Sequence, residues 1–567
     1  MLNNKCEKSG DSLYKHYSLR KHATLAQADI RGKLRGRAVS APPTVADAAV
    51  IPAYYSLAMA VLTSDWCLEA AICASALLLG LCLHARRKHD YWRKRGVKYA
   101  EPRFLFGNVA ACLLGKKSPH DLIRETYEKG AGEKVIGLYV FDKPYLILRD
   151  PELIKYVFIK DFGNFSNKVL CGKHTDVMSA ANLFLVNNPP WKYIRTKISP
   201  IFTSGKLKKM YELMMEICVD LQDHLDKFDI DEKVGKPLEI KEICSRFTTD
   251  LIGATAYGLQ LNSLKDPDAI FRKNGRQVFR SSFKRYLQLL ALFFIPSLRP
   301  YTNAKFFDEK ATEFLRNTFG DVINRRMESG DKRADLVDML IEIKKKQDRD
   351  PNAHYKLEGD ALIAQAAVFF TGGFETSSTT MSFALYALAR HPEIQAKLRT
   401  EILNALETPG GQMSYEKLMS LPYLNMVVNE ALRLYPVLPW IDRIPETDYT
   451  FPGTNITVEK GVPLILPMRT LHLDPDYFPD PDKFIPERFS EENKKNIVPC
   501  TFFPFGEGPR NCIGLRLGII QSKLGIVNFL SRYELSICKE TDFKIDHMHV
   551  LTQAKGGICL NFRKLPA

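Results

Sequence analysis

One ten-residue segment near the carboxyl end restricts this chain more than any other feature. It is Phe505-Gly506-Glu507-Gly508-Pro509-Arg510-Asn511-Cys512-Ile513-Gly514, and an apolar helical pattern follows it over 513–531. Two glycines permit a tight and unusual backbone turn. The turn places Cys512 at the positive end of a helix, where the dipole and the N–H groups stabilise a thiolate. Such a thiolate can be an axial ligand of iron, although an inert, buried side chain is the commoner fate of a lone cysteine.

The composition is that of a folded chain. Of 567 residues, 45% are hydrophobic and 26% are charged, which excludes a mostly disordered protein. There is no repeat of 20–50 residues, so a solenoid is excluded as well. The net charge is +15, but the basic residues are spread along the whole chain. This spread argues against a nucleic-acid-binding protein and suits an anionic membrane or an acidic protein partner.

The twelve cysteines are scattered along the chain, and no two of them form a CxxC pair. Their spacing indicates neither a disulfide framework nor a zinc site. We expect a reduced compartment in which most of them are small buried hydrophobic side chains.

Residues 66–85 form an apolar run of the length that a membrane span needs, with one acid, Glu69, near its start. Arg86, Arg87, Lys88, Arg93, Lys94 and Arg95 follow it, and no Lys or Arg lies between Pro52 and Leu68. The positive-inside rule therefore places the rest of the chain in the cytosol. A cleaved secretory signal has the reverse charge order, so we predict a retained signal-anchor. The alternative is a buried core helix.

Residues 1–65 precede this anchor, and the first 58 of them are polar, basic and without an apolar period. We predict a disordered or non-native extension that an upstream start codon adds, because Met59 makes a normal short lumenal start for such an anchor. A mitochondrial presequence is the alternative.

Residues 86–567 are expected to form one large, mainly helical domain with small β-sheets, because no long Gly/Ser-rich linker divides them. A hairpin is predicted over 135–148, around Asp142-Lys143-Pro144, and a helix is predicted to open at Asp150-Pro151. A short strand is predicted at 456–458. Helical patterns lie at 206–228, 241–258, 303–328, 334–347, 360–390, 392–406, 422–435 and 513–531.

The cysteine segment resembles the haem-ligand loop of the cytochromes P-450, which are haem-thiolate monooxygenases, and other motifs of that family follow in the family's order. Glu430 and Arg433 lie three residues apart on one helix and can pair. With Arg488 of a Pro-Glu-Arg-Phe segment they resemble the family's Glu–Arg–Arg core triad, which locks the loop that presents the cysteine. Further residues match positions that hold haem b, through its propionates or beside its sulfur ligand: Trp191, Arg195, Arg443, Phe505 and Arg510.

The helix predicted at 360–390 contains Gly372-Gly373-Phe374-Glu375-Thr376. Paired glycines weaken a helix and can open a groove in it. The resemblance implies that this is the oxygen groove over the iron, where Thr376 would hydrogen-bond dioxygen or its water and Glu375 would relay protons. A bent core helix, in which hydroxyls bond back to carbonyls, is the alternative. The family usually has alanine before a single glycine here, where this chain has Thr371 and Gly372.

Further segments, YWRKRGV at 91–97, FLFGN at 104–108 and LDPDYFPDPDKFIPERF at 473–489, resemble the insect microsomal family 6 of these enzymes. That family oxidises plant toxins, insecticides and other lipophilic compounds. By resemblance, residues 164–188, Phe369, Phe370 and 437–441 line the substrate cavity. The stretch 164–168 is less arginine-rich than the family pattern. The apolar segment 287–295 is expected either to enter the bilayer or to pack in the core.

No GxGxxG segment opens a helix after a strand, so the chain has no flavin or nicotinamide site of its own. The resemblance implies electrons from NADPH through the membrane-bound cytochrome P-450 reductase, with cytochrome b5 as a further possible donor, at the endoplasmic reticulum. Lys192 and Lys197 are candidates for contact with the acidic reductase, although they can equally be ordinary solvated lysines.

Three functions remain open at this stage. The first is a monooxygenase that acts on lipophilic xenobiotics, or on an endogenous hormone or lipid. The second is a haem-thiolate sensor without turnover, which would need no proton relay. The third is an isomerase of pre-formed peroxides, which would need no reductase. The substrate and the oxidised carbon cannot be named from the sequence.

Overall fold

The computed structural model describes residues 66–169, 176–279, 282–349, 355–407 and 413–566. The proposed extension over 1–65 lies outside these residues. The chain divides into two compact units, Met1–Gly80 and Leu81–Ala567. The helix α3 (Trp66–His89) begins in the first unit, and among the described residues it is the one helix long and apolar enough to cross a membrane. Leucines along it, such as Leu77 and Leu79, are exposed, which argues against a buried core helix.

The predicted hairpin is confirmed. Strand β1 (Val135–Val140) pairs antiparallel with β2 (Lys143–Leu148), so the turn consists of Phe141 and Asp142. This turn begins one residue earlier than predicted, because Phe141 adopts the left-handed conformation with a φ of 56°. Pro144 consequently lies inside β2, opposite Tyr139.

The hairpin extends into a four-stranded sheet that reaches the functional site. Strand β2 runs parallel to β7 (Leu464–Leu466), and β7 pairs antiparallel with β4 (Ile441–Arg443), giving the order β1-β2-β7-β4. Strand β4 ends at Arg443, so the sheet fixes the position of that side chain.

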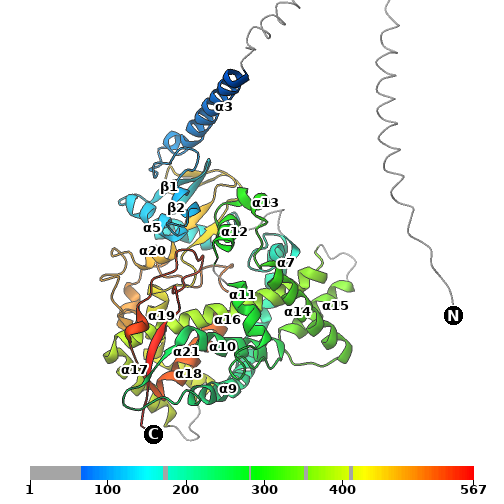
Figure 1. Cartoon of the computed structure of the whole chain (residues 1–567), viewed down its shortest axis with the longest axis vertical. Helices are drawn as coiled ribbons and strands as arrows, with labels where there is room; N and C mark the ends of the chain where they lie inside the picture. The colour runs from blue at the N-terminus through cyan, green and yellow to red at the C-terminus, as the bar shows by residue number, and fades with distance from the viewer. Residues whose placement is uncertain (1–65, 170–175, 280–281, 350–354, 408–412, 567) are drawn as a thin grey trace, which may run out of the picture. The chain divides into compact units, whose positions relative to one another are not determined.

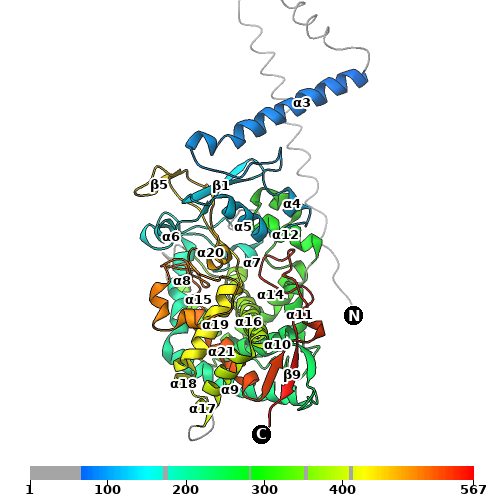
Figure 2. The same cartoon turned by 90° about the vertical axis from the view of Figure 1, so that its left-hand side faces the viewer.

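The described residues also form two smaller sheets. One has the order β3-β9-β8, with β3 (Lys236–Glu239), β9 (Cys559–Lys564) and β8 (Tyr533–Ser536) all antiparallel. The other pairs β5 (Tyr449–Thr450) with β6 (Thr457–Val458). The strand predicted at 456–458 is therefore confirmed. Figure 2 shows β9 close to the carboxyl end of the chain.

The long helix α16 (Gly359–Arg390) is the centre of the helical part. It packs against α10 (Ile240–Ile252), α14 (Glu309–Ser329), α19 (Pro422–Leu434) and α21 (Leu515–Leu530). Figure 1 shows α10, α16 and α21 side by side. The side chains of these helices belong to one large apolar core, and a second core lies around the four-stranded sheet.

The remaining helices surround these two cores. They are α4 (Ala110–Leu113), α5 (Pro119–Lys129), α6 (Pro151–Lys155), α7 (Val177–Ala180), α8 (Pro190–Ile198), α9 (Ser204–Asp226), α11 (Ile270–Val278), α12 (Phe283–Phe293), α13 (Arg299–Thr302), α15 (Leu336–Asp348), α17 (Pro392–Leu406), α18 (Tyr415–Ser420) and α20 (Met468–His472).

The predicted helices are present, and side-chain caps decide where several of them begin. Asp150 accepts a hydrogen bond from the Glu152 N–H and so caps α6, as predicted. The helix predicted from 303 begins only at Glu309, because Asp308 caps it through the Ala311 N–H. The helix predicted over 241–258 changes at Gly253 into a π-helical turn that runs to Tyr257.

The segment 287–295 packs in the core. None of its residues is exposed, and Leu290, Leu292 and Ile295 are completely buried. Of the two expectations for this segment, core packing is therefore the correct one, and bilayer entry through it is wrong.

Candidate functional site

The loop before α21 has the backbone that its glycines predict. Gly506 and Gly508 adopt left-handed conformations, with φ values of 71° and 70°. A Cβ atom on Gly508 would lie 1.9 Å from the carbonyl oxygen of Phe158, so no other residue fits there. The Cys512 N–H donates to the Phe505 carbonyl over 2.8 Å. The cysteine thus lies three residues before the first residue of α21.

The thiol of Cys512 is surrounded by protein and yet keeps accessible surface. Desolvation raises its pKa, while the Gly514 N–H and the cations Arg195 and Lys168 act in the opposite direction. The side chain is nevertheless exposed to a water-sized sphere. The neighbouring cations and the Gly514 N–H are groups that can stabilise the thiolate.

Arginines from two elements lie beside the cysteine. From α8, Arg195 donates to the backbone oxygen and to the side-chain oxygen of Asn511, each over 2.8 Å. Arg510 donates to the carbonyls of Ser166 and Val186, and its guanidinium lies 4.9 Å from the centre of the Trp191 ring. The structure therefore brings Trp191, Arg195 and Arg510 together around the cysteine loop.

Two further cations complete this group. Arg443 is 1% exposed, and its Nε has no hydrogen-bond partner among the described residues. Burial lowers the pKa of Arg443 to about 10. Lys168 is also buried, and its pKa is lowered well below the usual value by desolvation and by the charges of Arg510 and Arg443. The sequence alone did not identify Lys168 as a site residue. The signal that could have found it is the segment 164–168, which is less arginine-rich than the family pattern.

Glu430, on α19, joins Arg433 and Arg488 as the triad predicts. Its carboxylate is completely buried and accepts hydrogen bonds from Arg433 Nε and Nη2 over 2.8 Å each and from Arg488 Nε over 3.4 Å. Arg433 also donates to the carbonyls of His472, Pro481 and Lys483. The triad thereby ties α19 to the irregular segment that leads toward the cysteine loop.

The two glycines of α16 differ in their surroundings. A Cβ on Gly373 would lie 2.6 Å from Cδ1 of Ile252, so this glycine lets α16 and α10 approach closely. A Cβ on Gly372 would meet nothing within 4 Å, and Gly372 is exposed in a helix whose other faces are largely buried. Open space therefore lies beside Gly372, on the same helix face as Thr376.

The helix itself is continuous from Gly359 to Arg390, so the glycine pair does not interrupt it. Hydroxyls bond back to carbonyls one turn earlier, as the alternative interpretation expects. The Thr376 hydroxyl donates to the Gly372 carbonyl over 2.7 Å, and Thr380 donates in the same way to Thr376 over 3.1 Å. The open space beside Gly372 therefore results from the lack of a side chain at that position, and the helix itself is intact.

Glu375 points into a separate polar cluster. It is 5% exposed, lies 2.9 Å from the Lys241 Nζ of α10, and accepts a 2.8 Å hydrogen bond from Gln553 Nε2. Lys241 also donates to Ser245 and to Ser378. These contacts fix the carboxylate in position, and a role in proton relay stays a prediction.

The chain was then compared with known proteins. Residues 98–560 match the family described as Cytochrome P450. The chain belongs to the cytochrome P450 family. Cytochrome P450 6k1 of Blattella germanica is 40% identical over 493 residues, covering 84% of this chain and 93% of that protein. Probable cytochrome P450 6g2 of Drosophila melanogaster is 40% identical over 501 residues, covering 86% and 96%. The resemblance to insect family 6 is therefore confirmed, and this P450 is an oxidoreductase of the monooxygenase class.

Members of this family carry haem, and the residues of this P450 fit that group. Haem needs an axial ligand on one face and partners for two carboxylates at its edge. The accessible thiol of Cys512 suits the first need. Arg443 and Lys168 suit the second, because they are buried cations with Asp442 as a shared acidic neighbour, and a further anion would lower the cost of burying them.

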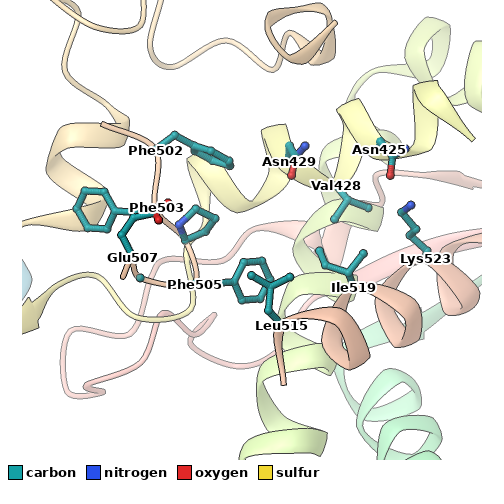
Figure 3. A pocket seen from close by; sticks show the side chains of 12 residues that line it. Asn425, Val428, Asn429, Phe502, Phe503, Phe505, Glu507, Leu515, Ile519 and Lys523 are labelled. Carbon is teal, nitrogen blue, oxygen red and sulfur yellow. The ribbon is translucent and has the colours of Figure 1, made fainter. Parts of the chain in front are cut away.

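A different cavity, of about 300 Å³, lies beside the segment that leads into the cysteine loop. Figure 3 shows its lining: Asn425, Val428 and Asn429 from α19, Phe502, Phe503, Phe505 and Glu507 from the loop, and Leu515, Ile519 and Lys523 from α21. Cys512, Arg443 and Thr376 do not line it, so we do not assign the haem to this cavity. Phe505 lines this cavity, and its carbonyl accepts the hydrogen bond from the Cys512 N–H.

The residues expected around the substrate have mixed surroundings. Phe370 is 1% exposed and packs against Phe271, Phe319 and Phe374, so it belongs to the core. Phe369 is partly buried and stacks on Phe202 at 5.9 Å between ring centres. Residues 170–175, in the middle of the expected 164–188 lining, lie outside the described residues.

Proposed function

We propose that this P450 is a membrane-anchored monooxygenase that oxidises lipophilic xenobiotics, such as plant toxins and insecticides, with electrons that cytochrome P450 reductase takes from NADPH. The observation that carries the proposal is the group of cations around Cys512: Arg195 and Lys168 act on its thiol, and the buried Arg443 and Arg510 lie near Lys168. When bound there, haem b supplies the activation of dioxygen from which one oxygen atom reaches the substrate.

Each side chain has a defined task in this proposal. The Cys512 thiolate would ligate the haem iron, and Phe505, whose carbonyl accepts from the Cys512 N–H, would lie beside that ligand. Three arginines with Trp191 and Lys168 hold the propionates by charge-assisted hydrogen bonds; the arginines are Arg195, Arg443 and Arg510. The Glu430–Arg433–Arg488 triad keeps the loop in place and touches neither haem nor substrate.

Thr376 is the proposed proton-handling group. Its hydroxyl donates to the Gly372 carbonyl, and a small rotation directs the same O–H toward the open space beside Gly372. There it would hold a water and a proton near the reacting oxygen. Glu375 would restore that proton from its cluster with Lys241 and Gln553.

The location follows from α3. We propose that α3 anchors the protein in the endoplasmic reticulum membrane and that the basic residues after it keep residues 86–567 in the cytosol. This arrangement places the enzyme on the same membrane as its reductase and as dissolved lipophilic substrates. Cytochrome b5 is a second donor compatible with the same orientation.

The proposal differs from its alternatives in what it requires of a reductase. NADPH should be consumed only when the reductase is present, and mass spectrometry of a panel of plant toxins, insecticides, hormones and fatty acids should show products with one added oxygen. A sensor would give no product, and a peroxide isomerase would act without NADPH. Products from hormones or fatty acids alone would replace the xenobiotic assignment by an endogenous one.

Replacing Thr376 tests the site. Thr376→Ala should keep the carbon monoxide difference spectrum of a thiolate-ligated haem, because it leaves Cys512 untouched. It should divert reducing power from product into peroxide by about tenfold or more, because the proton donor is lost. Peroxide and product are measured per NADPH consumed.

Thr380→Ala is the matched control, because Thr380 bonds back along the same helix one turn further on. Cys512→Ala should abolish the thiolate spectrum and Cys500→Ala should keep it. If Thr376→Ala and Thr380→Ala coupled NADPH to product equally well, the role of Thr376 would be wrong.

A second prediction concerns the surface of this P450 that would contact the reductase. Lys192 and Lys197 are exposed on α8, the helix that carries Trp191 and Arg195. Reversing both charges, Lys192→Glu with Lys197→Glu, should slow reduction by the acidic reductase several-fold at low salt, and the difference should shrink with added salt. Reversal of the exposed Lys310 on α14 is the control. Equal rates for both proteins, measured by stopped flow, would remove these lysines from the contact.

A further inference from the structure

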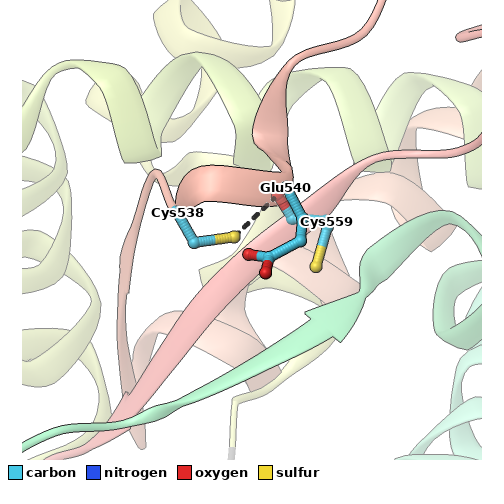
Figure 4. A group of neighbouring side chains, drawn as sticks. All are labelled: Cys538, Glu540 and Cys559. Atoms are coloured by element: carbon cyan, nitrogen blue, oxygen red, sulfur yellow. Dashed lines mark hydrogen bonds between the residues drawn. The ribbon is translucent and has the colours of Figure 1, made fainter.

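Three potential metal ligands converge at the carboxyl end of this P450. Cys538 follows β8, Glu540 lies in the short helix η8 (Lys539–Thr541), and Cys559 is the first residue of β9. The two sulfurs and a Glu540 oxygen all lie within 4.8 Å of one another. Figure 4 shows the three side chains gathered at one spot. Among the described residues this is the one such group of three or more cysteine, histidine or acidic side chains.

The sheet register brings the two cysteines together across 20 intervening residues. Strands β8 and β9 pair antiparallel, with Ser536 opposite Asn561. Strand β8 ends at Ser536, and this register, continued two residues along the extended backbone, would bring Cys538 opposite Cys559. Side chains two residues apart on a strand share a face, so both sulfurs lie on one side of the sheet.

Hydrogen bonds of Thr541 fix the turn that contains Glu540, the third potential ligand. The Cys538 N–H donates to Thr541 Oγ1 over 2.7 Å, and the same hydroxyl donates to the Cys559 carbonyl over 2.7 Å. Thr541 is 9% exposed, so these bonds are shielded from water. The backbone on both sides of the cluster is therefore fixed before any ligand binds.

The donor set selects a class of ion. Two thiolates and one carboxylate suit Zn²⁺ or Cd²⁺, whereas Ca²⁺ and Mg²⁺ require oxygen ligands. Zn–S bonds of about 2.3 Å and Zn–O bonds of about 2.0–2.2 Å place the donor atoms roughly 3.5–4 Å apart. Small side-chain rotations reach this spacing from the present one. The cysteines are partly exposed and Glu540 is exposed, so an ion and a water as fourth ligand can enter.

A cation of this class binds cysteine as the thiolate, so it must displace both thiol protons. Binding should therefore release protons and strengthen as pH rises toward neutrality and above.

We propose that Cys538, Glu540 and Cys559 bind a divalent cation of the zinc class, Zn²⁺ or Cd²⁺, where η8 meets the β8–β9 ladder. The ion would fasten η8 to the first residue of β9. Because β9 also pairs with β3, and Glu239 of β3 accepts from the Lys241 N–H at the start of α10, the ion would stabilise the junction between the carboxyl-terminal sheet and the helical core. This site is independent of the haem site.

The test uses the full-length holoenzyme, purified under reducing conditions and dialysed against Cd²⁺ alone or Zn²⁺ alone. We expect one tightly bound ion per haem and, for Cd²⁺, an absorption band from sulfur-to-cadmium charge transfer. Cys538→Ser and Cys559→Ser should each weaken binding by at least about tenfold and reduce the band. Glu540→Gln should weaken binding less and keep the band. Since Glu540 is exposed, this variant should fold normally.

Cys500→Ser is the matched control, because Cys500 is another partly exposed free cysteine outside the cluster. The control should bind the ion as the unaltered protein does. Equal affinity in the Cys538→Ser, Cys559→Ser and Cys500→Ser variants would overturn the proposal. A Cys538–Cys559 disulfide, found by mass spectrometry in protein isolated with its thiols blocked at lysis, would also overturn it in favour of a redox cross-link.

Discussion

For single residues near Cys512, burial decides which charges are available for a ligand. Arg195 donates to Asn511 through both of its Nη atoms. Arg443, in contrast, has a buried Nε without a hydrogen-bond partner among the described residues. Among the described residues, the Lys168 ammonium lies 3.3 Å from the Phe184 carbonyl oxygen and 4.0 Å from the centre of the Phe184 ring, with Asp442 as an acidic neighbour. A buried cation gains most when a further anion arrives. Arg443 and Lys168 are therefore the residues most sensitive to the haem propionates.

We predict that Lys168→Met and Arg443→Met each speed the loss of haem by roughly tenfold, because each removes a charge-assisted hydrogen bond worth about 1.5–3 kcal/mol. Transfer of haem to an excess of apomyoglobin measures the rate. Lys192→Met, on the exposed face of α8, is the control and should lose haem at the unaltered rate. A Lys168→Met protein as slow as this control would show that Lys168 does not reach the propionates.

At the scale of elements, two adjacent glycines of helix α16 serve different purposes. Gly373 allows contact with Ile252 of α10, and Gly372 leaves space open next to Thr376. The sequence predicts the unusual Gly-Gly pair and its position in a helix. It cannot say which glycine serves packing and which serves the cavity, because that depends on where α10 lies.

The two glycines should respond differently to alanine. Each Gly→Ala change gains up to about 1 kcal/mol of helix propensity, but only Gly373→Ala must displace Ile252. We expect Gly372→Ala to be more stable than Gly373→Ala by about 1–2 kcal/mol, with Ile252→Val restoring most of the difference. Denaturant unfolding of the holoenzymes measures this. Equal stability of the two variants would contradict the close α10–α16 contact.

The Glu430–Arg433–Arg488 triad includes contacts that a sequence motif predicts and contacts that depend on the folded chain. Glu430 and Arg433 share a helix face by their spacing, and the structure confirms their bidentate pair. That Arg433 also holds three carbonyls between His472 and Lys483 is a property of the folded segment. Because a buried charge pair is costly unless every polar atom is satisfied, these carbonyls explain why the pair is stable in the core.

For the whole molecule, the boundary between the two compact units lies inside helix α3, between Gly80 and Leu81. Helix α3 continues past the apolar run, and within the second unit Ala85 is buried and His89 Nε2 lies 2.9 Å from the Phe141 carbonyl oxygen. Trp92 is completely buried against Gly137, where any Cβ would collide with its ring. The body therefore needs residues that directly follow the anchor.

Two truncations test this boundary. A chain that begins at Leu81 should keep the thiolate spectrum and leave the membrane pellet on alkaline carbonate washing. A chain that begins at Val97 also lacks Trp92, which should cost about 3–5 kcal/mol, so it should yield little haem-loaded protein. The full-length protein should stay in the pellet. If the chain from Leu81 also stayed there, a surface other than α3 would hold this P450 to the membrane.

Local pattern alone predicted the family, the cysteine loop, the triad, the helices and an apolar helix long enough to cross a membrane, because spacings of one to four residues and an apolar run are visible in a linear chain. Only the folded structure decided that Lys168 joins Arg443 and Arg510, that Glu375 pairs with Lys241 and Gln553, and that Cys538 meets Cys559. These partners lie tens to hundreds of residues apart. Helix packing and strand register bring them together, and neither leaves a periodic signal in the sequence.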